Sequence, residues 1–207
     1  MRGELGGYVY RYEPGPSERT LLLLHGTGAD ENDLVPLGRA LAPDAGLLSP
    51  RGKVLEFGAP RFFRRQAEGV FDLEDLERQT ADLGKFVTAA AEGHGFELSH
   101  VVAVGFSNGA NIAASLLLRR PELVRAAALF SPMVPFEPDD SPDLGGMRIF
   151  IGAGRLDPIA TVDHVERLTK IFESGGADVS VYWFSGSHTL VQPEVDEAKR
   201  WLQALSS

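Results

Sequence analysis

The sequence predicts an α/β domain whose central sheet is mostly parallel and carries helices on both faces. Short apolar runs alternate along the chain with longer segments of helical period, as expected of parallel strands joined by crossover helices. Each apolar run leaves into a loop marked by glycine or proline. The 207 residues contain no internal repeat, low-complexity tract or linker, and we therefore expect one domain over residues 1–207.

The predicted strands are short apolar runs, which are typical of strands buried on both faces of a sheet. They cover residues 20–24, 46–48, 101–104, 126–130, 147–151 and 179–184. The predicted helices repeat apolar residues at spacings of three, four or seven. One starts at the N-cap Asp72 and ends near 93–95, one follows the strand at 101–104 and stops at Pro121, one covers 162–172, and one starts at Pro193.

The stretch from Val54 to Phe71 is predicted as one long irregular segment, and it contains Arg61-Phe62-Phe63-Arg64-Arg65. Long ordered loops are more often functional than accidental. We interpret the arginines as a solvated cluster or a subunit contact, with steering of an anionic substrate as the alternative.

Composition excludes several classes of function. The net charge of -9 would repel nucleic acid and anionic lipid over most of the surface, so we expect no nucleic-acid partner. The absence of cysteine removes disulfides, thiolate metal sites and a thiol nucleophile. No apolar run has the length of a secretory signal or of the roughly 20 residues that cross a bilayer. We therefore expect a cytoplasmic protein without integral membrane association.

Ser107 stands in the pentapeptide Gly105-Phe106-Ser107-Asn108-Gly109, which matches G-x-S-x-G between a predicted strand and a predicted helix. A sharp turn at this point would hold the serine in a strained backbone conformation at the helix N-terminus. The two glycines would let strand and helix approach without a Cβ clash. This context favours a catalytic nucleophile over a loop serine between flexible glycines.

A serine nucleophile needs a base, and the base needs an orienting acid. His188 follows the last predicted strand, at the same sheet edge as Ser107. His25 is expected to brace the glycine turn beside it, and the other histidines are predicted at the surface: His94, His100 and His164.

Asp157 is the candidate acid because it follows the strand at 147–151, although an ordinary Asp-Pro turn is the alternative. The competing carboxylates lack a preceding strand end: Asp139, Asp140, Asp143 and Asp163. The chain order Ser107, Asp157, His188 is the nucleophile, acid, histidine order of the α/β-hydrolase fold.

Acyl transfer also needs donors for the oxyanion, and the backbone N–H groups of Thr27 and Asn108 are the candidates. The turn at Thr27 lacks the lysine and the spacing of a phosphate-binding loop. Metal ligation is not expected, because no two histidines have helical i, i+4 spacing and cysteine is absent.

These motifs resemble the phospholipase/carboxylesterase family of α/β hydrolases, which includes acyl-protein thioesterases and small bacterial carboxylesterases. The resemblance covers Leu22–Gly28, Gly105–Gly109, Gly152–Pro158 and Gly186–His188, and the bacterial branch is indicated by Asp30–Leu34, Ser49–Gly52 and Arg61–Arg65. It implies an α/β-hydrolase fold, catalytic roles for Ser107, Asp157 and His188, and oxyanion donors at Thr27 and Asn108. It is also compatible with a homodimer. Asn108 stands where acyl-protein thioesterases usually have glutamine.

The predicted function is hydrolysis of small carboxylic esters through an acyl-enzyme on Ser107, without a cofactor or a metal. The chain leaves little length for a lid, which favours an open site. Candidate pocket walls are apolar residues from loops at the carboxyl edge of the sheet, although each fits the core equally well: Leu34, Phe62, Phe63, Phe71, Met133, Pro135, Phe136, Leu156 and Leu190.

Three alternatives stay open. An acyl thioesterase or lysophospholipase would use the same triad and differ in pocket shape. A dienelactone-type hydrolase is disfavoured, because such enzymes usually rely on cysteine and this chain has none. A non-catalytic small-molecule sensor would keep the α/β-hydrolase shell and use the triad as a binding pocket.

Overall fold

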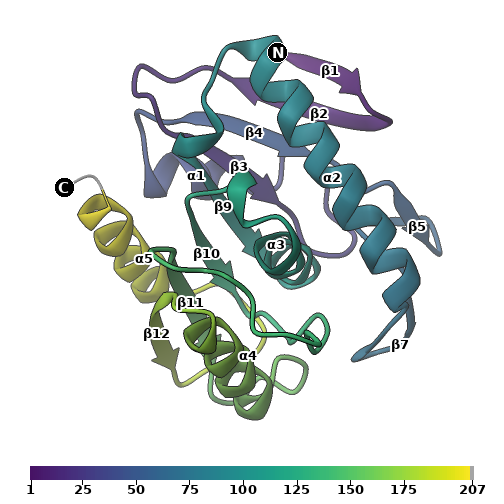
Figure 1. Cartoon of the computed structure of the whole chain (residues 1–207), viewed down its shortest axis with the longest axis vertical. Helices are drawn as coiled ribbons and strands as arrows, with labels where there is room; N and C mark the ends of the chain where they lie inside the picture. Colours follow the sequence, from purple (N-terminus) through teal and green to yellow (C-terminus); the bar gives the residue numbers. More distant parts are fainter. Residues whose placement is uncertain (206–207) are drawn as a thin grey trace.

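The computed structural model describes residues 1–205, and within them an eight-stranded sheet forms the centre of the molecule (Figure 1). The strands are β1 (Arg2–Leu5), β2 (Tyr8–Glu13), β3 (Thr20–Leu24), β4 (Gly46–Pro50), β9 (Val101–Phe106), β10 (Ala126–Phe130), β11 (Arg148–Gly154) and β12 (Asp178–Phe184). Their order in the sheet is β1-β2-β4-β3-β9-β10-β11-β12. Strand β2 runs antiparallel to both of its neighbours, and every pairing from β4 to β12 is parallel.

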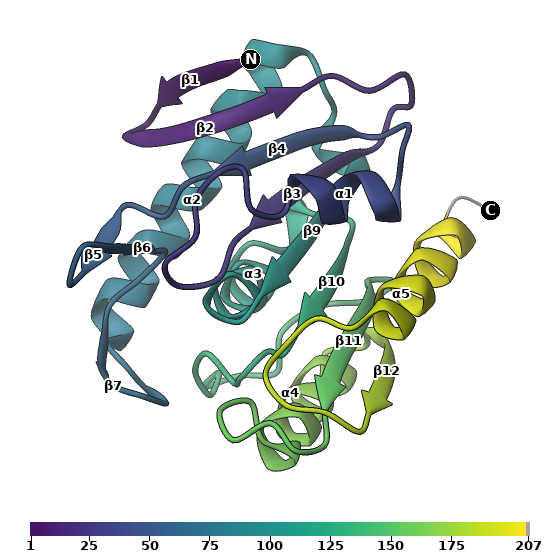
Figure 2. The ribbon, with the colours of Figure 1, turned by 180° about the vertical axis from the view of Figure 1, so that it is seen from behind.

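Helices cover both faces of the sheet, as the α/β-hydrolase fold requires. Helices α2 (Leu73–His94), α3 (Asn108–Arg119) and α4 (Val162–Ser174) lie in front of the sheet in Figure 1 and pack into one apolar cluster. Helices α1 (Val35–Leu41) and α5 (Gln192–Ala204) lie in front in the reverse view of Figure 2 and form a second cluster. Short 3-10 turns precede β9 and β10, namely η1 (Leu98–His100) and η2 (Pro121–Leu123).

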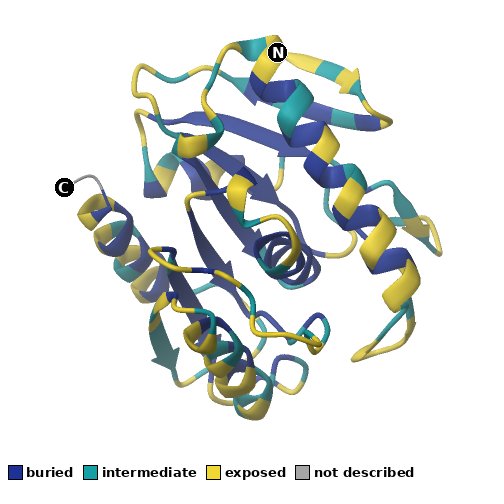
Figure 3. Ribbon diagram, in the orientation of Figure 1, coloured by how far each residue is buried: buried dark blue, intermediate teal, exposed yellow. Residues whose placement is uncertain are grey.

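The predicted strands and helices are confirmed, with several strands extending one to three residues further than expected. Strands β3, β4 and β10 are buried along their whole length, and helix α3 is buried on all sides from Asn108 to Leu117, whereas α2, α4 and α5 are buried on one side only (Figure 3). The predicted N-cap is also present, because the Asp72 carboxylate accepts the Asp75 N–H at 3.0 Å. Helix α2 ends at Gly95, whose φ of 73° is the left-handed conformation that glycine adopts most readily.

The segment from Val54 to Phe71 is a correction to the prediction. It forms the hairpin β5 (Val54–Glu56) and β6 (Ala59–Arg61), followed by the hairpin β7 (Arg65–Ala67) and β8 (Val70–Phe71). These strands contain only two or three residues each, too few to show an alternating pattern. The edge hairpin β1–β2 and helix α1 were not predicted either.

Among the described residues, no helix combines the length and the apolar character needed to span a membrane.

Candidate active site

Ser107 occupies a sharp turn between β9 and α3. Its φ of 53° and ψ of -116° lie in a region that a residue with a side chain seldom adopts, and the surrounding structure must hold it there. The Ser107 N–H donates to the Phe130 carbonyl at 2.9 Å, and the Ser107 carbonyl accepts the Asn111 N–H at 3.0 Å. The serine is therefore fixed to the neighbouring strand on one side and to its own helix on the other.

The glycines on either side of Ser107 are required by close backbone contacts. A Cβ at Gly109 would overlap the carbonyl oxygen of Leu24 on β3, and a Cβ at Gly105 would lie 2.6 Å from the Gly109 carbonyl oxygen. The predicted strained turn with close approach of strand and helix is confirmed.

A chain of hydrogen bonds joins the three side chains predicted to act together. His188 Nε2 lies 2.8 Å from Ser107 Oγ, and His188 Nδ1 lies 2.7 Å from Asp157 Oδ2. The other Asp157 oxygen, Oδ1, accepts the N–H groups of Ile159 at 2.8 Å and Ala160 at 2.9 Å. Because these two donors and burial fix the carboxylate, it holds Nδ1–H and leaves Nε2 free to accept the serine proton.

The topology explains why these residues meet. Ser107, Asp157 and His188 follow β9, β11 and β12, which run parallel in one half of the sheet, so all three emerge at its carboxyl edge. Strand β3 lies beside β9 with Leu24 opposite Gly105. The loop carrying Thr27 therefore emerges next to the turn that carries Ser107 and Asn108.

His25 braces the loop after β3, as predicted. Its side chain is fully buried, and Nδ1 donates to the Gly26 carbonyl at 2.7 Å while Nε2 accepts the Gly52 N–H at 3.0 Å. Burial lowers the pKa of His25, which keeps the ring neutral and suited to one donor and one acceptor bond. The remaining histidines lie away from Ser107: His94 bonds to Tyr10, His100 pairs with Glu18, and His164 is on α4.

A cavity of about 320 Å³ opens beside Ser107 and His188. Thr27 and Asn108 border it, together with Phe71 and Met133 from the predicted walls. The lining also includes residues that sequence reasoning missed: Asn111, Ser131, Ile159, Glu68 and Gly69. Asn111 lies one helical turn after Ser107, which is the one signal that the sequence offered for it.

The other predicted walls lie elsewhere, which corrects the pocket prediction. Leu34, Phe62 and Phe63 are core residues with almost no exposed surface. Phe136 stacks against the Arg119 guanidinium at 4.4 Å, Leu156 is 72% exposed, Leu190 packs on the α5 side of the sheet, and Pro135 is buried. Being in a loop at the carboxyl edge does not determine whether a side chain turns to the cavity or to the core.

The arginine cluster is engaged in internal ion pairs. Arg61 is buried and pairs with Glu56, and Arg65 pairs with the same carboxylate at 2.9 Å. Arg64 pairs with Asp72 at 3.1 Å. Arg61 and Arg65 also contribute to the cavity lining, so this segment forms a wall of the site.

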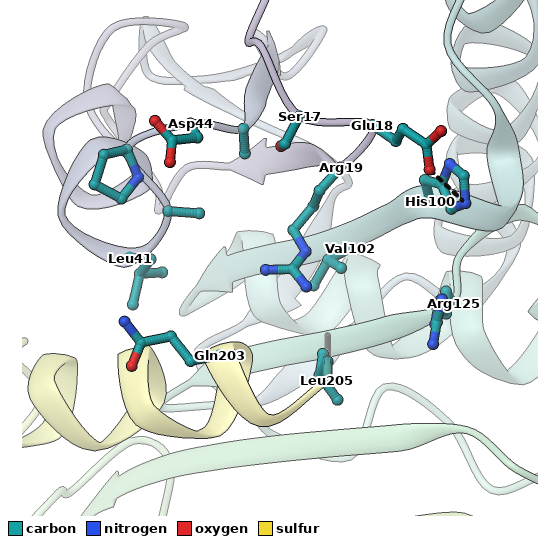
Figure 4. Close-up of a pocket in the computed structure, with 13 residues that line it drawn as sticks. Ser17, Glu18, Arg19, Leu41, Asp44, His100, Val102, Arg125, Gln203 and Leu205 are labelled. Carbon is teal, nitrogen blue, oxygen red and sulfur yellow. Dashed lines mark ion pairs between the residues drawn. The ribbon is translucent and has the colours of Figure 1, made fainter. Parts of the chain in front are cut away.

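A separate cavity of about 460 Å³ lies at the opposite edge of the sheet (Figure 4). Arg19, His100 and Arg125, which precede β3, β9 and β10, line it together with the end of α5. It shares no lining residue with the cavity at Ser107. Within residues 1–205, no three histidine, aspartate or glutamate side chains are grouped so that they could hold a metal ion.

Comparison with known proteins gives consistent matches along the chain. The model of the dienelactone hydrolase family matches residues 59–201. Putative hydrolase MhqD of Bacillus subtilis (strain 168) is 50% identical over 190 residues, which are 92% of this chain and 95% of that protein. The Bacillus cereus carboxylesterase structure gives a TM-score of 0.93 at 43% identity, covering 95% of this chain and 94% of that one. The Mesorhizobium loti carboxylesterase gives 0.90 at 35% identity, covering 95% and 94%.

Proposed function

Because this chain belongs to the dienelactone hydrolase family and is a hydrolytic enzyme acting on esters, we propose that it cleaves small carboxylic esters by acylating Ser107. The observation that carries the proposal is the hydrogen-bond chain from Ser107 Oγ through His188 to the buried Asp157 carboxylate. A serine in a strained turn, a base within reach and an orienting acid are the parts that nucleophilic acyl transfer needs.

The family match bears on one alternative from the sequence. A dienelactone-type hydrolase with a cysteine nucleophile stays disfavoured, because the chain has no cysteine. The matched region of residues 59–201 includes the turn at Ser107. The absence of cysteine therefore excludes a thiol nucleophile, and it does not exclude the family.

In the first half-reaction, His188 Nε2 removes the Ser107 proton as Oγ attacks the ester carbonyl carbon. The developing imidazolium is stabilised by Asp157, whose own position is held by the Ile159 and Ala160 amides. The proton then passes from His188 to the leaving alcohol oxygen as the carbon–oxygen bond breaks. This leaves an acyl group on Ser107 Oγ.

The oxyanion of each tetrahedral intermediate would bind the backbone N–H groups of Thr27 and Asn108. Asn108 is the first residue of α3, where free N–H groups and the helix dipole both favour negative charge. His188 Nε2 then takes a proton from water as the water oxygen attacks the acyl carbon, and it returns this proton to Ser107 Oγ as the bond from the acyl carbon to Oγ breaks and the acid leaves. Every proton in the cycle moves through one imidazole nitrogen, so no cofactor is needed.

The cavity supports a small substrate. Its volume of about 320 Å³ is near the lower end of ligand pockets in proteins. Phe71, Met133 and Ile159 supply apolar surface for an acyl chain, and Arg65 and Glu68 are charged members of the lining. This composition favours short esters over long-chain lysophospholipids.

The test is turnover of matched aryl esters and acyl thioesters with acyl chains of increasing length. We expect the highest kcat/KM for short-chain esters, and we expect Ser107→Ala to reduce it by about 10⁴-fold or more. Higher kcat/KM for thioesters would reassign the substrate class. Ester turnover that survives Ser107→Ala would refute the proposal.

A further inference from the structure

Two asparagine side chains on the first turn of α3 bind the main chain of two separate loops. Asn108 Oδ1 accepts the Phe62 N–H at 2.7 Å, and Asn111 Oδ1 accepts the Met133 N–H at 2.7 Å. A backbone N–H can only donate, so the acceptor in each side chain must be the amide oxygen. Asn108 is 3% exposed and Asn111 is 4% exposed, so both bonds are shielded from water.

Both loops contribute to the lining of the cavity at Ser107. Phe62 belongs to the segment whose Arg61, Arg65 and Phe71 line it, and Met133 lines it from the loop after β10. Phe62 lies beyond β6 and Met133 lies beyond β10, so both belong to irregular segments. In each bond the asparagine supplies the acceptor for a backbone N–H of such a segment. The walls are therefore tied to the same helical turn that carries the nucleophile.

The Asn108 side chain makes its bond to Phe62 although its own amide nitrogen is left without a partner. Its Nδ2 is buried without a hydrogen-bond partner in the described part of the chain. A buried amide donor without a partner is unfavourable, so the acceptor bond to Phe62 is the interaction that accounts for asparagine at this position.

We propose that Asn108 and Asn111 are positioning residues that fix the two loops lining the cavity and thereby set the length of acyl chain selected. This inference rests on the proposed ester hydrolysis at Ser107. When one asparagine is lost, its wall is free to shift, and the cavity admits longer chains while the Ser107–His188–Asp157 contacts persist. Size selection by a pocket depends on such fixed walls, and one methylene in a well-defined pocket changes kcat/KM by about tenfold.

The experiment measures kcat/KM for the best ester and for the ester two carbons longer, and the readout is their ratio. Asn111→Leu removes the acceptor, whereas Asn111→Asp retains an acceptor oxygen. The negative charge that Asn111→Asp introduces near the oxyanion would slow the hydrolysis of both esters alike, so its effect cancels from the ratio. Ser115→Ala is the matched control, because Ser115 is on α3 with the two asparagines and its Oγ makes a buried 2.7 Å bond to Thr80 Oγ1 on α2, away from the cavity.

We expect Asn111→Leu to lower the ratio by about tenfold, Asn111→Asp to restore most of it, and Ser115→Ala to leave it unchanged. A ratio within twofold of wild type in Asn111→Leu would overturn the inference, as would equal loss in all three variants.

Hydrogen exchange at the Met133 amide gives a readout independent of turnover, and it should accelerate in Asn111→Leu but not in Ser115→Ala. Unchanged exchange would refute the inference even if ester hydrolysis failed, and such failure would refute the proposed function alone. If Asn111→Leu does not fold, Asn108→Leu and Asn108→Asp test the other wall by the same ratio.

Discussion

Asp157 gives its two carboxylate oxygens different partners. Oδ1 accepts two backbone N–H groups and Oδ2 faces His188 Nδ1. Asparagine can keep the first set of bonds through its own oxygen, but its NH₂ group would then face Nδ1 and force the imidazole into the tautomer that cannot accept the Ser107 proton.

We therefore expect Asp157→Asn to fold normally and to lower kcat for ester hydrolysis by about 10⁴-fold. The control is Asp163→Asn, which changes an exposed carboxylate in the first turn of α4. Steady-state kinetics and a melting curve on both variants check this. Wild-type kcat in Asp157→Asn would contradict the role assigned to the acid.

Glu194 is a buried carboxyl group that the proposed mechanism does not use. Its side chain packs against Gly152 on β11, where a Cβ would overlap Oε1, and that oxygen has no hydrogen-bond partner among residues 1–205. The other oxygen accepts the Val191 N–H at 3.4 Å. Burial raises the pKa of Glu194 from 4.5 to about 7, so the folded protein holds this proton at a pH where the unfolded chain has released it.

The raised pKa predicts that stability falls with increasing pH. Between about pH 4.5 and pH 7 the folded state binds more protons than the unfolded state. The stability that Glu194 gains from its bound proton is therefore complete below pH 4.5 and is lost as the pH rises through 7, by about 3 kcal/mol in all. Glu194→Gln stays neutral, so its stability relative to wild type should increase by roughly 2 kcal/mol between pH 5 and pH 8. Urea denaturation at both pH values measures this, with the partly exposed Glu197→Gln on the same helix as control. Equal pH dependence in wild type and Glu194→Gln would contradict it.

The residues that bear the proposed chemistry could be predicted from the sequence, and the cavity wall could not. Ser107, Asp157 and His188 are identified by chain order and by their position after strands, which depend only on local pattern. The wall depends on which way a loop side chain turns. Phe62 and Phe63 illustrate this, because both lie in the predicted loop yet point into the core.

At the scale of elements, the close contact between α3 and β3 is possible because residue 109 is a glycine and has no side chain. Gly109 brings the first turn of α3 against the carbonyl of Leu24, and a methyl group has no space there. Gly109→Ala should lower the free energy of unfolding by about 3 kcal/mol or more.

The matched substitution is Gly93→Ala near the end of α2, where an added Cβ meets nothing within 4 Å. It should raise stability by roughly 0.5–1 kcal/mol because alanine is the better helix former. Urea denaturation of both variants gives the comparison. Two variants of equal stability would show that the turn at Ser107 tolerates a looser contact than the structure describes.

The elements that sequence reasoning missed carried weak or overlooked signals. Strand β2 buries Tyr8, Tyr10 and Tyr12 in alternation, and a Gly6-Gly7 turn with positive φ joins it to β1, which is a recognisable hairpin pattern. In contrast, the β5–β6 turn places Phe57 at a φ of 50°, where asparagine or glycine is the usual residue. Helix α1 has seven residues and no side-chain cap, so it gives little periodicity.

At the scale of the whole molecule, the sheet brings together residues that are far apart in the sequence. His188 lies 81 residues after Ser107, and the two meet because β9 and β12 run in the same direction and end at one edge. The continuous apolar strands and the helical segments between them predicted this parallel arrangement. The edge strands and the two small hairpins beside the cavity add to it without changing where the strands end.

The most direct test of the account is covalent capture of the nucleophile. The purified protein is treated with a fluorophosphonate, which phosphonylates an activated serine, and the product is analysed by intact mass and peptide mapping. We expect one adduct per chain, located on Ser107, absent from Ser107→Ala and formed far more slowly in His188→Ala. A folded wild-type protein that takes no adduct, or takes it on another residue, would contradict the proposed nucleophile.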